Sequence, residues 1–280
     1  MLAYRHLFHA GNFADVFKHV LLTRLLIALG KKDKPYCYLD THAGIGLYDL
    51  THEWAQKLGE YRDGIARLWD RDDVPALVQP YMDAVRAENR SGRLRWYPGS
   101  PRIARRLLRP DDRAELTELN RDDANALGKL FDGDAQVHVH LMDGYHALKA
   151  FLPPKERRGL VLIDSSFDRS KEFARLAEAL AFAHRRWSTG IYALWYPLMH
   201  SSAMHGFERD IAATGIRKIL KLELSVLPEG WNESLRGCGL LVVNPPFGFR
   251  EEARELLPWL WEALSEARTG RAEVRWLVPE

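Results

Sequence analysis

The feature that most constrains this chain is a regular alternation of short apolar runs with helical patterns. The runs are rich in Val, Ile, Leu and Tyr, as buried strands are. We expect strands at Tyr36–Leu39, Ala114–Leu119, Val137–Met142, Leu160–Ile163, Ile191–Trp195, Ile219–Val226 and Leu240–Val243. Because strands that alternate with helices form a sheet covered on both faces, the sequence predicts an α/β fold with a mostly parallel seven-stranded sheet.

Two stretches depart from this alternation. No helical pattern fills Leu227–Gly239, between the last two runs, so we expect a hairpin there and one antiparallel strand near the C-terminus. The connection from Asp40 to Ala114 spans about seventy residues, where a helix and two loops need about thirty. We therefore predict one domain over residues 1–280, with a helical insertion subdomain at about residues 50–95.

Composition and charge exclude few functions. The two cysteines, Cys37 and Cys238, lie in apolar runs without metal-ligand spacing, which favours a reducing compartment. No run reaches the roughly 18 apolar residues of a membrane span, and the start has no signal-peptide pattern. We therefore expect a cytoplasmic monomer without membrane contact.

The net charge of +2, from 40 basic and 38 acidic residues, neither requires nor excludes a nucleic-acid partner. Such a partner needs only a local basic surface. One candidate is a set of arginines that share one side of a predicted helix: Arg102, Arg105, Arg106 and Arg109. The alternative interpretation is an ordinary solvated helix face, since charged helix faces are common.

The ends of the first four predicted strands have the form of a ligand site. Asp40 precedes Gly44 and Gly46, and glycines at the carboxyl end of a strand let a ligand approach the backbone. That turn alone is consistent with a nicotinamide cofactor, another nucleotide, S-adenosylmethionine or no ligand. The chain has no Gly-Lys-Ser/Thr sequence, so we expect no phosphate-binding loop of that type.

The next three strand ends favour S-adenosylmethionine. Glu118 can accept hydrogen bonds from both ribose hydroxyls of a nucleoside, and Asp143, before Gly144, can accept one from an adenine amino group. Asp164 follows the fourth strand. Such a row of carboxylates is typical of S-adenosylmethionine-dependent methyltransferases, and it suits a cationic sulfonium better than a pyrophosphate.

Several stretches spread over the chain together carry a family resemblance. They are Tyr4-Arg5-His6, His9–His19, Leu39–Gly44, Tyr97–Pro101, Leu116–Leu119, Ala193–Pro197, Gly215–Leu220 and Trp276–Glu280. The sequence resembles the 23S rRNA adenine-N6 methyltransferase family of Gram-negative bacteria over its whole length, and the opening block is highly specific. Members are also described as proteins needed for the use of external DNA as a nutrient.

The resemblance implies a Rossmann-like methyltransferase fold and transfer of a methyl group from S-adenosylmethionine to N6 of adenine 2030 in 23S rRNA, leaving S-adenosylhomocysteine. It places seven residues in the cofactor pocket: Lys18, His19, His42, Ser100, Glu118, Asp143 and Gly144. The strand-end pattern adds Asp40, Gly44 and Asp164 to this set. The resemblance also implies that Asp164 is the catalytic residue and that Tyr4 contacts the RNA.

The loop after the fourth strand departs from the family pattern. The family has Asp-Pro-Pro-Tyr, or a close variant, where this chain has Asp164-Ser165-Ser166-Phe167. We expect Asp164 and the Ser165 carbonyl to accept the two amino N–H groups of the target adenine, and Phe167 to stack on the flipped base. Without the prolines the loop has more freedom. An alternative is therefore an S-adenosylmethionine-binding protein whose activity is lost or directed at DNA.

A second loop spells a better-known amino-methyltransferase motif, Asn244-Pro245-Pro246-Phe247. It follows the last strand of the predicted hairpin, whereas the catalytic loop belongs after the fourth strand. We therefore favour Asp164 and keep Asn244 as the alternative.

Two further groups of residues allow more than one interpretation. Four histidines could suggest a metal site: His6, His9, His19 and His42. They lack a tight ligand spacing, and methyl transfer from a sulfonium needs no metal, so we expect none. Three aromatic residues of the insertion are expected to form its small core, with an RNA-stacking platform as the alternative: Trp54, Trp69 and Tyr81.

Overall fold

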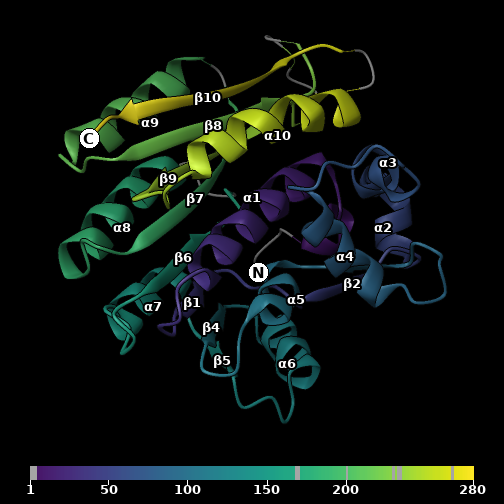
Figure 1. The fold of residues 1–280 in the computed structure, drawn as a ribbon, viewed down its shortest axis with the longest axis horizontal. Helices are drawn as coiled ribbons and strands as arrows, with labels where there is room; N and C mark the ends of the chain where they lie inside the picture. Colours follow the sequence, from purple (N-terminus) through teal and green to yellow (C-terminus); the bar gives the residue numbers. More distant parts are fainter. Residues whose placement is uncertain (1–4, 168–170, 200, 229–230, 232–234, 266–267) are drawn as a thin grey trace.

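The computed structural model describes residues 5–167, 171–199, 201–228, 231, 235–265 and 268–280. Its centre is an eight-stranded sheet in the order β10-β8-β9-β7-β6-β1-β4-β5 (Figure 1). The strands are β1 (Cys37–Asp40), β4 (Arg113–Glu118), β5 (Val137–Leu141), β6 (Gly159–Ile163), β7 (Ile191–Pro197), β8 (Ile219–Ser225), β9 (Gly237–Val243) and β10 (Arg271–Val278). Neighbouring strands pair in parallel along the part of the sheet ordered β5-β4-β1-β6-β7, which confirms the predicted Rossmann-like α/β fold.

The C-terminal part of the sheet corrects the prediction in one respect. The expected hairpin is present, because β8 and β9 pair antiparallel from Ile219 opposite Val243 onward. An eighth strand, β10, pairs antiparallel with β8 at the edge, so both β9 and β10 run against the other strands. Residues 271–276 of β10 alternate charged and apolar side chains, and this strand therefore lacks the continuous apolar run on which the prediction relied.

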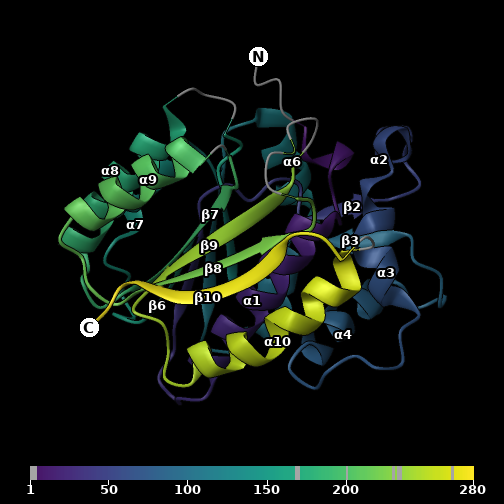
Figure 2. The ribbon, with the colours of Figure 1, turned by 90° about the horizontal axis from the view of Figure 1, so that it is seen from above.

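Helices cover both faces of the sheet (Figure 2). On one face lie α1 (Phe13–Gly30), α5 (Ser100–Leu107), α6 (Arg121–Leu130) and α10 (Phe249–Leu264), and on the other lie α7 (Gly144–Phe151), α8 (Glu172–Arg186) and α9 (Ser201–Ala213). Most of α1 is buried, because apolar residues occupy all sides of this helix. Within the described residues, no helix is both long and apolar enough to cross a membrane.

The long connection after β1 folds into short elements beside α1. They are β2 (Leu47–Asp49), α2 (Glu53–Leu58), η2 (Glu60–Asp63), α3 (Ile65–Trp69), α4 (Gln79–Glu88) and β3 (Trp96–Pro98). β2 and β3 form a separate antiparallel pair. Tyr81 of α4 is fully buried in the same hydrophobic cluster as Phe17 of α1. Helices therefore occupy the stretch where they were expected, while its status as a subdomain stays a prediction.

The register of the parallel strands determines where their ends lie. Asp40 is level with Leu116 of β4 and with Leu162 of β6. Glu118 comes two residues after Leu116, and Asp164 comes two residues after Leu162. Both therefore lie at the same carboxyl edge of the sheet as Asp40.

Candidate active site at the carboxyl edge of the sheet

A cavity of about 650 Å³ opens at this carboxyl edge. It brings together nine of the ten predicted cofactor-site residues: Lys18, His19, His42, Gly44, Ser100, Glu118, Asp143, Gly144 and Asp164. The predicted substrate residues Ser165 and Phe167 also line it. Tyr4, predicted to contact RNA, lies outside the described residues.

Asp40 is the predicted site residue that does not line the cavity. Its side chain is buried behind the wall, where Oδ2 accepts hydrogen bonds from the Tyr38 hydroxyl and from Ser100 Oγ, both at 2.7 Å. The His42 N–H lies 3.3 Å from Oδ1. Burial raises the pKa of Asp40 to about 6, because the loss of solvation outweighs these hydrogen bonds. Asp40 therefore positions Ser100 and the His42 backbone.

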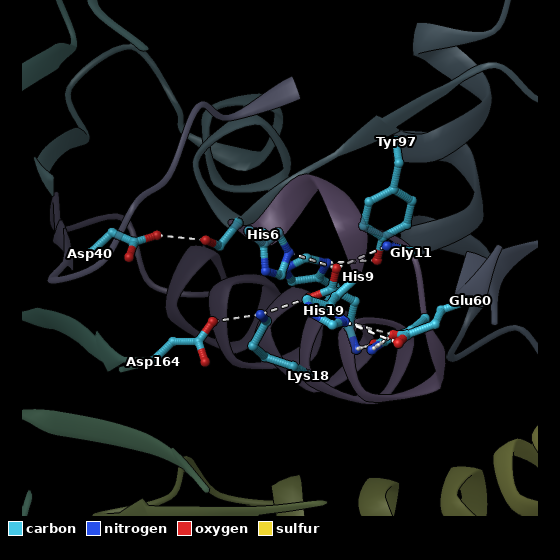
Figure 3. A network of polar contacts seen from close by, with 12 residues as sticks. His6, His9, Gly11, Lys18, His19, Asp40, Glu60, Tyr97 and Asp164 are labelled. Carbon is cyan, nitrogen blue, oxygen red and sulfur yellow. Dashed lines mark hydrogen bonds and ion pairs between the residues drawn. The ribbon is translucent and has the colours of Figure 1, made fainter. Parts of the chain in front are cut away.

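Lys18 links two carboxylates at the centre of the site (Figure 3). Its Nζ donates to Asp15 Oδ1 at 2.8 Å and to Asp164 Oδ2 at 2.5 Å. Asp15 also contacts His6 Nε2 and the Gly11 N–H, both at 2.9 Å. Although burial opposes both charges, Asp15 and Asp164 raise the pKa of Lys18. His6 and Lys18 together hold the pKa of Asp15 well below its ordinary value. Among the described residues, no hydrogen bond is made to Oδ1 of Asp164, which leaves that oxygen for a ligand.

His19 has a ring nitrogen whose hydrogen-bonding capacity is unused. Nδ1 lies 2.8 Å from the Tyr97 hydroxyl, whereas Nε2 is buried and has no partner among the described residues. Burial, reinforced by the charge of Lys18, lowers the pKa of His19 well below its ordinary value, so the ring is neutral. A buried polar atom without a partner costs about 1–3 kcal/mol. A polar ligand in the cavity would remove that cost.

Two backbone N–H groups orient the carboxylate of Glu118. Gly44 donates to Oε2 at 2.9 Å and Asn120 donates to Oε1 at 2.8 Å. Gly44 has φ +61°, and a Cβ at this position would lie 2.3 Å from the Tyr48 hydroxyl. Burial raises the pKa of Glu118. Each oxygen keeps a further lone pair, so Glu118 offers the two acceptors that a ribose diol requires.

Asp143 caps α7 and contacts α8. Its Oδ1 accepts from the N–H groups of Tyr145 at 2.9 Å and His146 at 3.1 Å, and its Oδ2 accepts from Arg175 at 3.1 Å. Although burial opposes the charge, these donors lower the pKa of Asp143. A Cβ on Gly144 would lie 2.0 Å from the Thr41 carbonyl oxygen, so a glycine is needed for α7 to begin this close to β1.

The loop after β6 carries a carboxylate at one end and an aromatic ring at the other. Ser165 between them is buried. Phe167 has φ +54°, a left-handed conformation that costs energy for an aromatic residue. Its ring packs 4.9 Å from the ring of Phe173 and 5.9 Å from that of Trp195. The ring is therefore held beside the cavity.

The alternative motif lies at the opposite edge of the sheet. Val243, which precedes it, pairs with Tyr192 near the start of β7. Asn244 is left-handed, with φ +52°, and its Nδ2 donates to the carbonyls of Ser188 at 2.9 Å and Gly190 at 2.8 Å. Asn244 thus stabilises a turn outside the cavity. The location of Asn244 away from the cavity favours Asp164 as the catalytic residue, although that role remains a prediction.

The arginines of the α5 region mostly pair within the molecule. Arg102 donates to Glu88 at 2.9 Å, Arg105 pairs with Asp134, and Arg109 donates to Asp112 at 2.8 Å. In the described part of the chain, only Arg106 of this set has no ion pair, and it is exposed. The set therefore ties α5 to its neighbours, and most of it is not a free basic surface.

Several charged residues that line the cavity were not predicted, among them Asp15 and Arg175. Asp15 had a local signal, since it precedes Lys18 by three residues, which places both on one side of a helix. Arg175 had none, because only folding brings α8 to the end of β5. Over the described ranges, no group of three or more His, Cys, Asp or Glu residues is placed to hold a metal ion.

Comparison with known proteins decides the family. The family model described as "Ribosomal RNA large subunit methyltransferase D, RlmJ" matches residues 33–278. Ribosomal RNA large subunit methyltransferase J of Escherichia coli K12 is 47% identical over 280 residues, and that of Haemophilus influenzae is 43% identical over 281, each over the full length of both chains. The chain belongs to the RlmJ family. The resemblance carried by the sequence motifs is thereby confirmed.

A solved structure shows the same architecture. The crystal structure of protein LPL1258 from Legionella pneumophila has a TM-score of 0.89 and 39% identity, covering 96% of this chain and 98% of that one. The RlmJ family model begins at residue 33, so the opening block with Lys18 and His19 is covered by the full-length relatives instead.

Proposed function

We propose that this chain transfers a methyl group from S-adenosylmethionine to N6 of an adenine in 23S rRNA, at position 2030 as the family resemblance implies. Both curated relatives are named as large subunit rRNA methyltransferases and align over their full length. The observation that carries the proposal is that Glu118, Asp143 and the Asp164 loop line one cavity. Because the proposed substrate is an rRNA, we expect the enzyme to act in the cytoplasm, and we expect a monomer.

The residues present fit the proposed cofactor. S-adenosylmethionine supplies a methyl group already activated on a sulfonium, so no metal is required. Glu118 would accept from the ribose hydroxyls, and Asp143 would accept from the adenine amino group. The remaining polar residues of the cavity would hold the methionine part: Lys18, His19, His42 and Ser100. The unused Nε2 of His19 supports this fit, since it lies buried in the cavity wall.

The catalytic loop acts on the target amino group through two acceptors. Asp164 Oδ1 would accept one N–H and the Ser165 carbonyl the other, which would localise the nitrogen lone pair toward the methyl group that the bound cofactor supplies. Lys18 holds Oδ2 of the same carboxylate at 2.5 Å and thereby fixes the orientation of the free oxygen. Positive charge develops on the amine during transfer, and the carboxylate of Asp164 stabilises it. Correct orientation supplies most of the rate enhancement.

The test is methyl transfer from labelled S-adenosylmethionine to 23S rRNA transcribed in vitro, followed by digestion to nucleosides and mapping of the modified base. We expect N6-methyladenosine at a single adenine and no transfer to DNA of the same sequence. Cofactor binding without transfer to RNA would indicate a binding protein that has lost its activity. Preferential transfer to DNA would overturn the choice of substrate.

A further inference from the structure

A row of aromatic rings leads from the cavity out over α2. His9 lines the cavity, and its ring lies 6.5 Å from that of Phe8. Phe8 in turn stacks on Trp54, with ring centroids 5.2 Å apart and an angle of 8° between the ring planes. His52 meets Trp54 edge-on at 5.4 Å. The contact with Phe8 fixes the plane of the Trp54 indole one helical turn from Leu58, which lines the cavity.

One side of α2 exposes two large apolar side chains where a solvated helix is normally polar. Trp54 and Leu58 lie one turn apart, so they share a side of the helix. Trp54 is 37% exposed and Leu58 is 51% exposed. Leu58 also lines the cavity, so this apolar surface is continuous with the site. Trp54 therefore differs from Tyr81, which is fully buried as expected for a core residue.

The charged residues around this surface suit a polyanion. Two acidic residues here are already paired: Glu60 lies 3.0 Å from His9, and Asp63 receives a hydrogen bond from Arg67 at 2.6 Å. Glu53 lies in the first turn of α2, where negative charge favours the helix. The exposed cations Lys57 and Arg62 are then placed to meet phosphates.

We propose that Trp54, held by Phe8, is a stacking subsite for the RNA base next to the target adenine. The proposal rests on the function proposed above. An adenine that enters the cavity must leave its stack, and this exposes one face of its neighbour. Aromatic side chains bind such unstacked bases without regard to sequence. Trp54 offers that ring one helical turn from Leu58, a residue of the cavity that would receive the adenine.

The first test compares Trp54→Ala with Trp54→Phe in steady-state methylation of a 23S rRNA fragment. We expect Trp54→Ala to raise the KM for RNA about tenfold, about 1.4 kcal/mol, which lies within the range for stacking of a base on an aromatic ring. Affinity for S-adenosylmethionine and kcat should stay within about twofold. Trp54→Phe should recover most of the loss. The matched control is Phe247→Ala, because Phe247 is fully exposed at the opposite edge, and its KM should not change.

The second test measures binding without turnover. RNA carrying 2-aminopurine beside the target adenine should change fluorescence on binding the wild type and Trp54→Phe, but not Trp54→Ala. An unchanged KM and an unchanged fluorescence response in Trp54→Ala would overturn the subsite. So would equal losses in both variants together with a lowered melting temperature, which indicates a structural role. A wild type that binds this RNA but transfers no methyl group would refute the proposed function and leave the subsite to be judged by fluorescence.

Discussion

Two aspartates end strands of the same sheet in very different environments. Asp40 is fully buried and its Oδ2 accepts two short hydrogen bonds, whereas the Asp164 side chain is 17% exposed and keeps one oxygen unpaired in the described structure. Burial suits a group that fixes its neighbours, and a reachable, unpaired oxygen suits a group that contacts the substrate. The supporting role of Asp40 and the reacting role proposed for Asp164 thus follow from their environments rather than from residue type.

The effect of replacing Asp40 with Asn on stability should depend on pH. The pKa of Asp40 rises from an ordinary 3.8 to about 6 on folding, so the folded state holds its proton more tightly. The resulting stabilisation is complete below the unfolded pKa and is lost as the pH rises through the folded pKa. The melting temperature of Asp40→Asn relative to the wild type should therefore increase from about pH 4 to about pH 7. A difference that does not vary with pH would contradict the buried ionisable carboxyl.

Removal of the Glu118 carboxylate should weaken cofactor binding. Glu118→Ala loses both proposed ribose acceptors, at a cost of roughly 1.5–3 kcal/mol, or about 10- to 150-fold in Kd. Glu118→Gln keeps one acceptor oxygen and should lose less. Calorimetric titration with S-adenosylmethionine measures both. Wild-type affinity in Glu118→Ala would refute this placement of the ribose.

At the scale of elements, the sequence predicts what depends on local pattern. The seven strands and their C-terminal hairpin could be predicted because each carries an apolar run or apolar side chains at alternate positions, as in β5. β10 was missed because Arg271, Glu273 and Arg275 interrupt its apolar side chains, although period-two alternation is itself a strand signal. The enclosure of Asp40 and the arrival of Arg175 could not be predicted, since both depend on packing between segments far apart in the chain.

The loop after β6 gives a prediction at the same scale. Ser165→Pro restores the family residue, and no acceptor for the Ser165 N–H lies among the described residues. Proline fixes φ and reduces the entropy lost when the loop adopts its reactive geometry. We expect single-turnover methylation to be equal to or faster than that of the wild type, with Ser166→Ala as the control. A loss of activity with unchanged melting temperature would show that the loop needs its freedom.

The molecule as a whole places the cavity and the Asn244 motif at opposite edges of the sheet. Asp164 and the cavity lie where the parallel strands end, and Asn244 lies where β7 begins. A motif search alone would choose Asn244, whereas strand direction excludes it from the cavity. The position of a motif in the sheet therefore decides its chemistry.

Asn244→Ala should accordingly lower stability without lowering turnover. It removes two hydrogen bonds and a residue that tolerates φ +52°, at a cost of about 2 kcal/mol in the free energy of unfolding. Asn244→Gly restores the backbone freedom but not the hydrogen bonds. Its free energy of unfolding, measured by chemical denaturation, should therefore lie between those of the wild type and Asn244→Ala. Unchanged stability in Asn244→Ala would contradict the structural role.

The most direct measurement of the central claim is single-turnover methylation of a 23S rRNA fragment by the wild type, Asp164→Ala and Asn244→Ala, each folded and bound to S-adenosylmethionine. We predict that Asp164→Ala abolishes transfer while it keeps its fold, and that Asn244→Ala reacts at nearly the wild-type rate. Full activity in Asp164→Ala, together with loss in Asn244→Ala, would contradict the assignment of the active site to the carboxyl edge of the sheet.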